Sequence, residues 1–582
     1  MFFENQYRTR TCAAVGESDV GRRVRLAGWV ENIRDHGGVL FLDLRDHYGT
    51  VQVVIHDDGM LEGVMKEAVV SIEGEVALRD PETVNPKLAT GTVELKAESL
   101  EVIGRSQGGL PFEVQSSTEI KEELRLRYRY LDLRNPRMQA MLKKRADLLL
   151  FLRNKMTGLG FTEVQTPILS ASSPEGARDY LIPARKHPGK FYALPQAPQI
   201  FKQLLMVSGV DRYFQIAPCF RDEDARADRS PGEFYQLDFE MAFATQEEVF
   251  TVAEQVLTEA FEKFTGKPVT HGPYPRITYR EAMLRYGSDK PDLRNPLFII
   301  DVSDIFDNCT FKPFQGHTVR AIRVPGCAAQ PRSFFEQMLE FATSIGMKGL
   351  GYVKANEEMK LLGPIDKFVP AEEKVRLIER SELASGDVLY FISDATEEAT
   401  AKLAGQIRAE LGRRLNLLTD DFRMCYIVDF PMYELDPVTR KVGFTHNPFS
   451  MPQGGLAALN EKDPLEILAW QYDIVCNGVE LSSGAVRNHD RETMVRAFEI
   501  AGYGEETVRE KFGSLYSAFA YGAPPHAGMA PGIDRMLMLM MDEPSIREII
   551  AFPMTANAED LLMGAPSEVT EKQLREAHIK VR

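Results

Sequence analysis

The chain has 582 residues, of which 44% are hydrophobic and 26% charged, and its formal net charge is −16 at pH 7. This length exceeds what one hydrophobic core supports, and domains of roughly 100 to 200 residues predict three to five of them. The negative charge argues against a protein that coats nucleic acid without sequence preference, because neutralising phosphates takes Lys and Arg. No apolar run approaches the roughly 18 residues of a spanning helix and no signal pattern begins the sequence, so we expect a cytoplasmic protein without membrane association.

The first 105 residues alternate short strand patterns with turns, and we expect them to form an OB-fold β-barrel. Phe41 and Gln52 lie on neighbouring strand segments, each between apolar residues that belong to the opposite face. An outward aromatic ring beside an outward amide suits a barrel that stacks and hydrogen-bonds single-stranded bases. A single outward Phe also fits ordinary surface packing, so the pattern alone leaves both interpretations open.

Changes in composition predict six segments along the chain. A Ser-Gln-Gly-Gly stretch followed by dense charge indicates a hinge, whose basic part from Lys121 to Arg137 fits either a nucleic-acid track or a solvated connector. An amphipathic helix is predicted from about Arg137 to Gly158, followed by a strand that leads to Pro167. The predicted segments are a barrel (1–105), a hinge (106–135), a first part of the site-bearing domain (136–288), an inserted domain (289–423), a second part (424–555) and a C-terminal extension (556–582).

The first charged motif is a predicted β-hairpin. Its outgoing strand ends in Cys-Phe-Arg-Asp-Glu, which contains Arg221, and its returning strand carries Gln-Leu-Asp-Phe-Glu. Apolar residues up to Phe243 occupy one face of the returning strand, which leaves Gln236, Asp238 and Glu240 on the other. Charges gathered on one face of a packed sheet are hard to explain as structure, and we interpret them as a binding surface.

The second motif is Gly-Met-Ala-Pro-Gly-Ile-Asp-Arg, in which Arg535 opens a predicted apolar helix. A helix N-terminus that follows glycines offers backbone N–H donors and a partial positive charge, and an Arg fork matches phosphate or carboxylate geometry. Together with the motif that contains Arg221, the chain has two motifs suited to binding an anion. We infer a polyphosphate that is held at both ends.

These two motifs resemble signature motifs two and three of the class II aminoacyl-tRNA synthetases, and the residues around them resemble the bacterial aspartyl type. The helix and strand before Pro167 resemble motif one, which builds the homodimer interface in that family. The resemblance covers nearly the whole chain in order. It implies an α+β multidomain fold with an N-terminal OB-fold barrel, an antiparallel-sheet catalytic domain and an inserted, GAD-like α/β domain. It also implies ATP-dependent attachment of L-aspartate to tRNA(Asp) through an aspartyl adenylate.

Adenylate formation needs a carboxylate in line with the α-phosphate of ATP, and positive charge where the phosphorus gains negative charge. The resemblance implies that Arg221 and Arg535 are the catalytic arginines, and it assigns Glu175 to a loop similar to the family's mobile loop. The Ser230 position departs from the family's commoner sequence, which leaves its contact to ATP open. The implied aspartate contacts are Glu175, Gln199, Lys202, Arg221, Asp238, His446 and Arg487, and the implied ATP contacts are Arg221, Asp222, Glu223, Glu480, Gly532, Ile533, Asp534 and Arg535.

Specificity and metal binding are assigned to further residues. A buried guanidinium at Arg487 would select aspartate over asparagine, because the amide would leave the cation unpaired in a dry pocket. Asp473 and Glu480 resemble the family's Mg²⁺ ligands, and hard oxygen ligands with ATP phosphates completing the shell fit that metal. Taken alone, two acids beside Asn477-Gly478 also fit a surface turn, and a single loop histidine such as His446 also fits a structural role.

The resemblance places tRNA contacts at His36, Phe41, Gln52 and Glu82. His36 stands where strictly aspartate-specific relatives have Leu, and relatives of the relaxed type, which also charge tRNA(Asn), have His. A ring with one donor and one acceptor can accept more than one base edge. Glu82, in contrast, stands where the relaxed type often has Gly. We expect charging of tRNA(Asn) besides tRNA(Asp), with strict specificity for tRNA(Asp) as the alternative.

Other functions compete with this interpretation. Lysyl- and asparaginyl-tRNA synthetases share the barrel and the motifs, but a lysine pocket needs acids where Arg487 and Lys202 stand, and an asparagine pocket should avoid a doubled cation. A non-catalytic RNA-binding relative would be expected to lose at least one implied arginine or metal ligand, and all are present. The sequence has neither a Walker A loop nor a G-x-G-x-x-G after a strand, which argues against a P-loop kinase or a dinucleotide enzyme.

Overall fold

The computed structural model describes residues 4–172, 177–307 and 309–581, and the chain divides at Gln139 and Ala140 into two compact units. Among these described residues, no helix has the length and the apolar composition that crossing a membrane requires. The first unit contains the barrel and the connection that follows it. The second unit contains a large sheet and, inserted between two of its strands, a smaller α/β layer.

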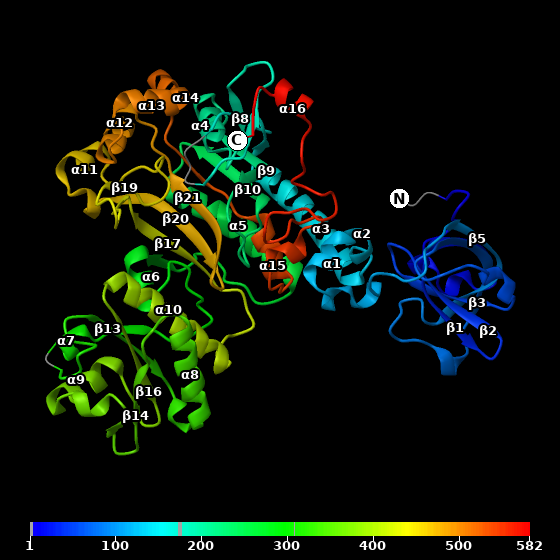
Figure 1. Ribbon diagram of the computed structural model, residues 1–582, viewed down its shortest axis with the longest axis horizontal. Helices are drawn as coiled ribbons and strands as arrows, with labels where there is room; N and C mark the ends of the chain where they lie inside the picture. Colours follow the sequence, from blue (N-terminus) through cyan, green and yellow to red (C-terminus); the bar gives the residue numbers. More distant parts are fainter. Residues whose placement is uncertain (1–3, 173–176, 308, 582) are drawn as a thin grey trace. The chain divides into compact units, whose positions relative to one another are not determined.

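The first unit is built on a closed β-barrel (Figure 1). Alternate residues of its strands, such as Leu42 and Val53, are fully buried in the interior. The predicted OB-fold barrel is therefore confirmed. In spatial order β1-β2-β3-β5-β4, its strands are β1 (Arg23–His36), β2 (Val39–Arg45), β3 (Thr50–Ile55), β5 (Val93–Gly104) and β4 (Val69–Leu78).

The connection after the barrel is largely helical, with η5 (Val114–Glu119), α1 (Glu122–Arg127) and α2 (Arg129–Asp132). Two arginines of its basic stretch, Arg125 and Arg129, are buried and paired with Asp132. The other carboxylate oxygen of Asp132 accepts a hydrogen bond from the Ser117 hydroxyl at 2.6 Å. Because these charges are satisfied inside the connection, Arg125 and Arg129 do not form the nucleic-acid track that the sequence allowed.

The second unit is organised by a mostly antiparallel sheet in which strands from distant parts of the sequence lie side by side (Figure 1). Only β6 with β9 and β11 with β17 pair in parallel within this described sheet. The predicted antiparallel catalytic fold is confirmed. In spatial order, the strands are β11 (Arg276–Thr278), β17 (Met424–Pro431), β20 (Leu468–Cys476), β21 (Val479–Val486), β22 (His526–Met529), β10 (Gly232–Ala242), β9 (Arg212–Arg221) and β6 (Thr162–Glu163).

Helix α5 (Gln246–Thr265) packs against this sheet through aromatic rings. Phe250 stacks on Tyr426 of β17 with ring centroids 3.6 Å apart, and it meets Tyr472 of β20 edge-on. The sequence also placed Phe243 on the buried face of β10, and this is wrong. The strand ends at Ala242, and Phe243 turns outward with φ of 54°, so that its side chain is 75% exposed.

The other helices surround the sheet or extend from it. The predicted amphipathic helix is α3, which ends at Gly158 as expected. The bounds are α3 (Pro136–Gly158), α4 (Gln199–Val207), α6 (Tyr279–Tyr286), α11 (Gly455–Glu461), α12 (Arg491–Ile500), α13 (Glu505–Lys511), α14 (Gly513–Ala518), α15 (Ile533–Met540) and α16 (Glu571–Glu576), with the small hairpins β7 (Leu181–Pro183) with β8 (Phe191–Ala193) and β18 (Tyr433–Leu435) with β19 (Val442–Phe444).

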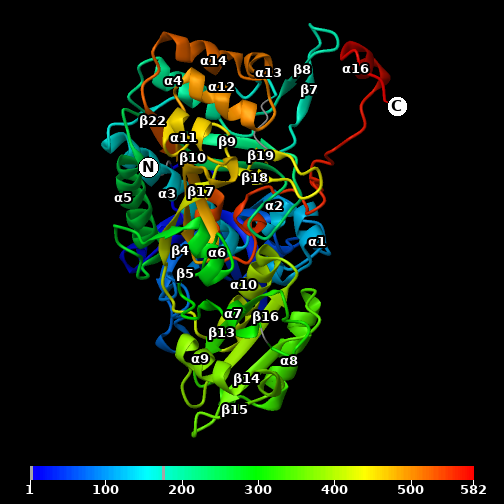
Figure 2. The same cartoon turned by 90° about the vertical axis from the view of Figure 1, so that its left-hand side faces the viewer.

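Between β11 and β17 the chain forms a separate α/β layer, as the inserted domain of the predicted fold. Its sheet has helices on both sides, with α8 and α10 against one face and α7 and α9 against the other (Figure 2). The boundaries at 289 and 423 stay predictions. The bounds are β12 (Ile299–Asp301), β13 (Thr318–Val324), β14 (Gly351–Ala355), β15 (Leu361–Leu362), β16 (Val388–Asp394), α7 (Ser303–Phe306), α8 (Arg332–Ser344), α9 (Ala371–Ser381) and α10 (Glu397–Arg414).

Candidate active site

A cavity of about 520 Å³ is lined by residues of α4, β9, β10, β20, β21 and the start of α15. Strands and helices that are far apart in the sequence therefore contribute to one site. Most of the predicted site residues line it. They are Gln199, Lys202, Arg221, Glu223, Asp238, His446, Asp473, Glu480, Arg487, Gly532, Asp534 and Arg535.

Two of the predicted aspartate and ATP contacts, Asp222 and Ile533, are not among the described residues that line the cavity. Asp222 faces Arg178, whose Nε lies 3.7 Å from the carboxylate. Ile533 is the first residue of α15 and is fully buried, because its side chain belongs to the apolar face of that helix. Glu175 lies outside the described residues. The first two positions can therefore meet a ligand in this cavity only through backbone atoms or after rearrangement.

One end of the cavity holds a buried ion-pair cluster. The Lys202 ammonium lies 2.7 Å from Asp238 Oδ1 and 3.2 Å from Glu240 Oε2. Arg487 donates from Nε to Glu240 Oε1 at 3.0 Å and from Nη2 to Glu240 Oε2 at 3.5 Å, and no described residue accepts a hydrogen bond from its Nη1. All of these residues are at most 2% exposed. The cluster balances two cations with two anions and leaves one guanidinium nitrogen free for a further acceptor.

Glu240 is the central anion of this cluster; the sequence placed it on the charged face of the returning strand but assigned it no contact to a ligand. Burial raises the pKa of Glu240, but Arg487 and Lys202 outweigh burial and hold it below its ordinary value. For Asp238, burial raises the pKa and Lys202 offsets only part of the rise. Gly528 on β22 makes room for β10 and for Glu240, since a β-carbon there would lie 2.1 Å from the Phe239 carbonyl oxygen and 2.3 Å from Glu240 Oε2. The small residue opposite the acid is a signal that appears only once strand pairing is known.

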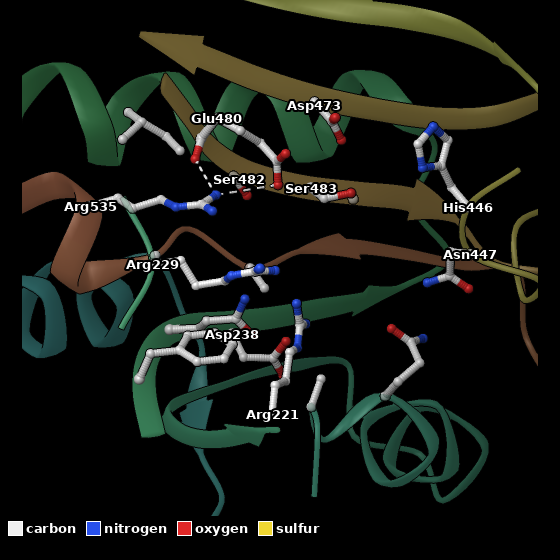
Figure 3. A pocket seen from close by; sticks show the side chains of 18 of the residues that line it. Arg221, Arg229, Asp238, His446, Asn447, Asp473, Glu480, Ser482, Ser483 and Arg535 are labelled. Atoms are coloured by element: carbon white, nitrogen blue, oxygen red, sulfur yellow. Dashed lines mark hydrogen bonds and ion pairs between the residues drawn. The ribbon is translucent and has the colours of Figure 1, made fainter. Parts of the chain in front are cut away.

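Asp473 and Glu480 lie on the neighbouring strands β20 and β21, with carboxylates toward the same hollow (Figure 3). The strands are joined by a tight turn at Asn477 and Gly478, whose φ values of 52° and 84° are the left-handed ones that such a hairpin turn needs. Burial, and then the charge of Glu480, raises the pKa of Asp473 well above its ordinary value. Asp473 Oδ1 is buried without a hydrogen-bond partner in the described structure. Two carboxylates that repel each other and offer oxygen atoms are suited to binding a hard divalent cation.

Lys290 is a further charged residue of the cavity that the sequence did not single out. Its ammonium lies 3.3 Å from Glu480 Oε2 and 2.6 Å from Asp289 Oδ2. Burial lowers the pKa of Lys290, but these two carboxylates outweigh burial and raise it. The available signal was a short charged stretch between Gly287 and a proline. Lys290 lies beside Glu480 because of the path that the chain takes into the inserted layer. No local sequence pattern predicts that path.

The two predicted phosphate-binding arginines, Arg221 and Arg535, point into the cavity from different sides (Figure 3). The Arg221 guanidinium lies over the Phe234 ring at 5.0 Å, and its Nε is buried without a hydrogen-bond partner among the described residues. Arg535, at the N-terminus of α15, donates from Nη1 to the Glu480 carbonyl oxygen at 2.7 Å, and its Nη2 lies 3.2 Å from Asp228. A ring contact orients a guanidinium without using its N–H groups. Arg221 is thus the arginine better prepared for an anion.

Two predicted ATP contacts already have protein partners. The Asp534 carboxylate accepts from the Tyr235 backbone N–H at 2.8 Å and from Arg145 at 2.6 Å. These bonds tie α15 to β10 and α3, so this side chain holds the site together. Glu223, in the loop after β9, accepts from Arg229 at 2.6 Å. Its carboxylate can meet a ligand only if this pair opens.

His446 follows β19 at the edge of the cavity (Figure 3). Its ring meets Phe430 edge-on with centroids 5.2 Å apart. Burial lowers the pKa of His446, so the imidazole is neutral near pH 7 and offers one donor and one acceptor. Asn447 beside it also lines the cavity and was not singled out in the sequence. A polar pair thus stands at this edge.

The predicted tRNA contacts lie on the first unit. The exposed His36 ring meets Phe41 edge-on, with centroids 5.6 Å apart. The Gln52 amide accepts from Arg34 at 3.4 Å and donates to Glu94 at 3.0 Å. Strands β1, β2 and β3 therefore bring the first three predicted residues onto one outer face of the barrel. The polar neighbours Arg34 and Glu94 were not singled out in the sequence, although both lie on strands where the alternation of polar and apolar residues marks the outer face.

The fourth predicted tRNA contact stands apart from this face. Glu82 is exposed in the short helix η4 (Pro81–Thr83), between β4 and β5. In residues 4–172, 177–307 and 309–581, no hydrogen bond or ring contact joins Glu82 to the residues of β1, β2 and β3. Its assignment therefore rests on the sequence alone.

The whole chain is similar to known proteins. The family model described as tRNA synthetases class II (D, K and N) matches residues 121–556, and the model described as OB-fold nucleic acid binding domain matches residues 24–103. An aspartate–tRNA ligase of Streptomyces coelicolor is 54% identical over 99% of this chain and 99% of its own length. An aspartate–tRNA(Asp/Asn) ligase of Erythrobacter litoralis is 55% identical over 99% of this chain and 96% of its own.

Solved structures share the fold. The asparaginyl-tRNA synthetase from Pyrococcus horikoshii complexed with asparaginyl-adenylate superposes with a TM-score of 0.56 at 19% identity, covering 94% of this chain and 98% of that one. The aspartyl tRNA synthetase from Entamoeba histolytica gives a TM-score of 0.55 at 19% identity, covering 92% and 89%. The fold of this chain thus recurs in proteins of low sequence identity.

Proposed function

Because this chain belongs to the class II tRNA synthetases of the D, K and N group, we propose that it uses ATP to attach L-aspartate to tRNA(Asp) through an aspartyl adenylate. The observation that carries this proposal is a set of buried polar atoms in the cavity without hydrogen-bond partners in the described structure. They include Arg221 Nε, Asp238 Oδ2 and Asp473 Oδ1. Buried polar atoms are normally satisfied, so a cluster of exceptions in one cavity supports a binding site.

The ion-pair cluster supports aspartate as the amino acid. Asp238 Oδ2 can accept a hydrogen bond from the α-ammonium, because Lys202 occupies only Oδ1. Arg487, with Nη1 free, suits the side-chain carboxylate of the substrate. The ammonium of a lysine substrate would meet two cations there, and the amide of asparagine would offer Arg487 Nη1 only a neutral acceptor where a carboxylate makes a charge-assisted hydrogen bond. Both alternatives are therefore disfavoured.

The arginines suit the ATP end of the site. Adenylate formation needs little proton transfer, so positioning and positive charge can supply most of the catalysis. We assign Arg221 to the α-phosphate and the reacting carboxylate, which it would hold together in line. We assign Arg535 and the backbone at Gly532 to the phosphates nearer the start of α15. In this assignment Glu223 leaves Arg229 to accept a hydrogen bond from the adenine amino group.

Asp473 and Glu480 would hold Mg²⁺. The fit rests on their donor set, since both offer hard oxygen atoms and Asp473 has a buried oxygen with no hydrogen bond. The protein supplies few ligands in the part that the structure describes, where no group of three or more His, Cys, Asp and Glu could hold a metal. The ion would supply positive charge to the ATP phosphates when bound. Lys290 at Glu480 provides one positive charge in the same region.

The exposed His36 favours charging of tRNA(Asn) besides tRNA(Asp). Its ring contacts Phe41 by an edge, which leaves ring nitrogens available to a base. Comparable charging of tRNA(Asp) and tRNA(Asn) transcripts is expected, and His36→Leu should shift the ratio toward tRNA(Asp). A preference of the unaltered protein for tRNA(Asp) above about a thousandfold would contradict relaxed specificity. With ATP and tRNA as substrates, we place the activity in the cytoplasm.

An apolar surface on α3 supports a homodimer. Leu150 is 60% exposed, and with Phe151 and Phe264 it lines a groove between α3 and α5. An exposed leucine beside two half-buried aromatic rings favours a protein partner. Light scattering after gel filtration should give twice the chain mass of 65.6 kDa. The mass of a single chain would contradict this proposal.

The direct test of the first step is ATP–pyrophosphate exchange with each of the twenty standard amino acids. Aspartate alone should support rapid exchange, because it alone presents a carboxylate side chain of the right length to Arg487. Exchange that depends on lysine or asparagine would overturn the assignment of the pocket. No exchange with any amino acid would support a non-catalytic relative.

A further inference from the structure

A chain of buried hydrogen bonds leads from a backbone carbonyl to the cavity. His526 Nδ1 lies 2.8 Å from the Pro524 carbonyl oxygen, and His526 Nε2 lies 3.0 Å from the Gln203 amide nitrogen. Gln199 then donates from Nε2 to Gln203 Oε1 at 3.1 Å. His526 and Gln203 are fully buried, whereas Gln199 is 5% exposed and lines the cavity. The two glutamines stand four residues apart on α4, so they share the inner face of that helix.

The far end of this chain fixes the direction of every bond in it. The Pro524 carbonyl oxygen can only accept, so the ring proton of a neutral His526 must sit on Nδ1. His526 Nε2 then carries a lone pair, and Gln203 must turn its NH₂ group toward it. This leaves Gln203 Oε1 facing Gln199, which must in turn present its own NH₂ group. The carbonyl oxygen of Gln199 is thereby left for the cavity.

The ring of His526 is suited to this role because it stays neutral. Burial lowers its pKa. Of the charged groups near it, Glu240 raises the pKa, whereas Arg487 and His489 lower it, and the Pro524 carbonyl also raises it. A charged ring would donate from both nitrogens and would reverse the direction of both amides.

We propose that His526 and Gln203 are positioning residues that hold the Gln199 amide with its oxygen toward the cavity, where it accepts a hydrogen bond from the α-ammonium of aspartate. This inference rests on the proposed function. The α-ammonium is the one donor group of an aspartate zwitterion, because both carboxylates only accept near neutral pH. Asp238 Oδ2 is a second acceptor in the same cavity. A reversed Gln199 would point its NH₂ group at the ammonium and weaken binding.

The test compares two replacements of the histidine. His526→Phe keeps a ring of similar size and removes both nitrogens, whereas His526→Gln keeps one donor and one acceptor. We expect His526→Phe to raise the KM for aspartate roughly tenfold or more, on the scale of a hydrogen bond to a charged group, with the KM for ATP within about threefold. His526→Gln should recover most of the loss. Equal losses in both variants would overturn the proposal.

A double-mutant cycle then separates positioning from general support of the fold. If His526 acts through the Gln199 amide, His526→Phe should change the KM for aspartate little in a Gln199→Ala background. Gln203→Met, which removes the amide at similar volume, should behave in the same way and serves if the histidine variant folds poorly. The same fold-change in both backgrounds would overturn the proposal.

Two controls complete the experiment. Succinate, which has both carboxylates of aspartate and no amino group, should inhibit unaltered protein and His526→Phe with inhibition constants within about threefold, and a loss as large as that for aspartate would overturn the proposal. Thr258→Val removes another buried hydrogen bond, to the Tyr274 hydroxyl at 2.7 Å, and should leave the KM for aspartate unchanged. If unaltered protein shows no aspartate-dependent exchange, the proposed function fails. If it does and the cycle is additive, only this inference fails.

Discussion

Replacing Arg487 by leucine removes the guanidinium that we place against the side-chain carboxylate of the substrate, and we expect aspartate activation to be lost while ATP binding persists. Arg487 is 2% exposed, and its Nε donates to Glu240 Oε1 at 3.0 Å. The substitution therefore has two effects. It takes a cation from the substrate, and it takes a partner from a buried glutamate.

The contacts of each group set the size of each effect. Removing one partner of a buried ion pair costs about 3 to 5 kcal/mol. Glu240 keeps Lys202, whose Nζ lies 3.2 Å from its Oε2, so the loss of folding stability should fall below this range. Lys202 is already shared between Asp238 and Glu240, so it replaces Arg487 poorly at the substrate. A loss of about 3 kcal/mol in transition-state binding lowers kcat/KM by more than about a hundredfold.

The assay is ATP–pyrophosphate exchange over a range of aspartate concentrations, with ATP binding measured separately by calorimetry. The double variant Arg487→Leu with Glu240→Gln also removes the glutamate charge that loses its arginine partner. It should regain thermal stability relative to Arg487→Leu and stay inactive, which separates damage to the fold from loss of substrate binding. Exchange by Arg487→Leu within tenfold of the unaltered protein would refute the assignment of Arg487 as the selector.

Three further predictions concern other parts of the molecule. Asp473→Asn should lower turnover strongly. Burial and a neighbouring carboxylate raise the pKa of Asp473, so the metal-free protein should lose stability as pH rises from about 4 through that raised pKa. In thermal unfolding with EDTA, Asp473→Asn should make the melting temperature depend less steeply on pH. An unchanged pH dependence would contradict this prediction. Phe41→Ala should raise the KM for tRNA and spare pyrophosphate exchange, since a stacked base is worth about 1 to 3 kcal/mol, whereas equal losses in both assays would mean that Phe41 supports the fold. Gly528→Ala should impair aspartate activation, because its β-carbon would lie 2.1 Å from the Phe239 carbonyl oxygen and 2.3 Å from Glu240 Oε2 and would displace the strand that carries Glu240. Gly504→Ala, where a β-carbon meets nothing within 4 Å, is the control, and equal activity of the two variants would contradict this role of Gly528.

Local patterns in the sequence predicted the features that local physics determines. Alternation placed Phe41 and Gln52 on the outer face of the barrel, and Asn477-Gly478 marked a hairpin turn with left-handed backbone angles. The same rule of alternation failed at Phe243, because the strand ends one residue earlier and nothing in the alternation marks that end.

Features that depend on distant contacts were not predictable in this way. Glu240 becomes the centre of the ion-pair cluster only because β22, nearly 300 residues away in sequence, pairs with β10 and places Gly528 opposite it. His526 joins the chain of buried hydrogen bonds for the same reason, since it pairs with Ala242 of β10. Lys290 reaches Glu480 through the path of the chain at the inserted layer. A single sequence without strand pairing contains no signal for these juxtapositions.

The most direct measurement of the central claim is transfer of labelled amino acid to a tRNA(Asp) transcript by the purified protein. Aspartate should be attached to the transcript in the presence of ATP and Mg²⁺, while labelled asparagine and lysine should not, because the cluster of Lys202 and Arg487 accepts a carboxylate side chain. Attachment of asparagine or lysine at a rate comparable to aspartate, or no attachment of aspartate at all, would contradict the account.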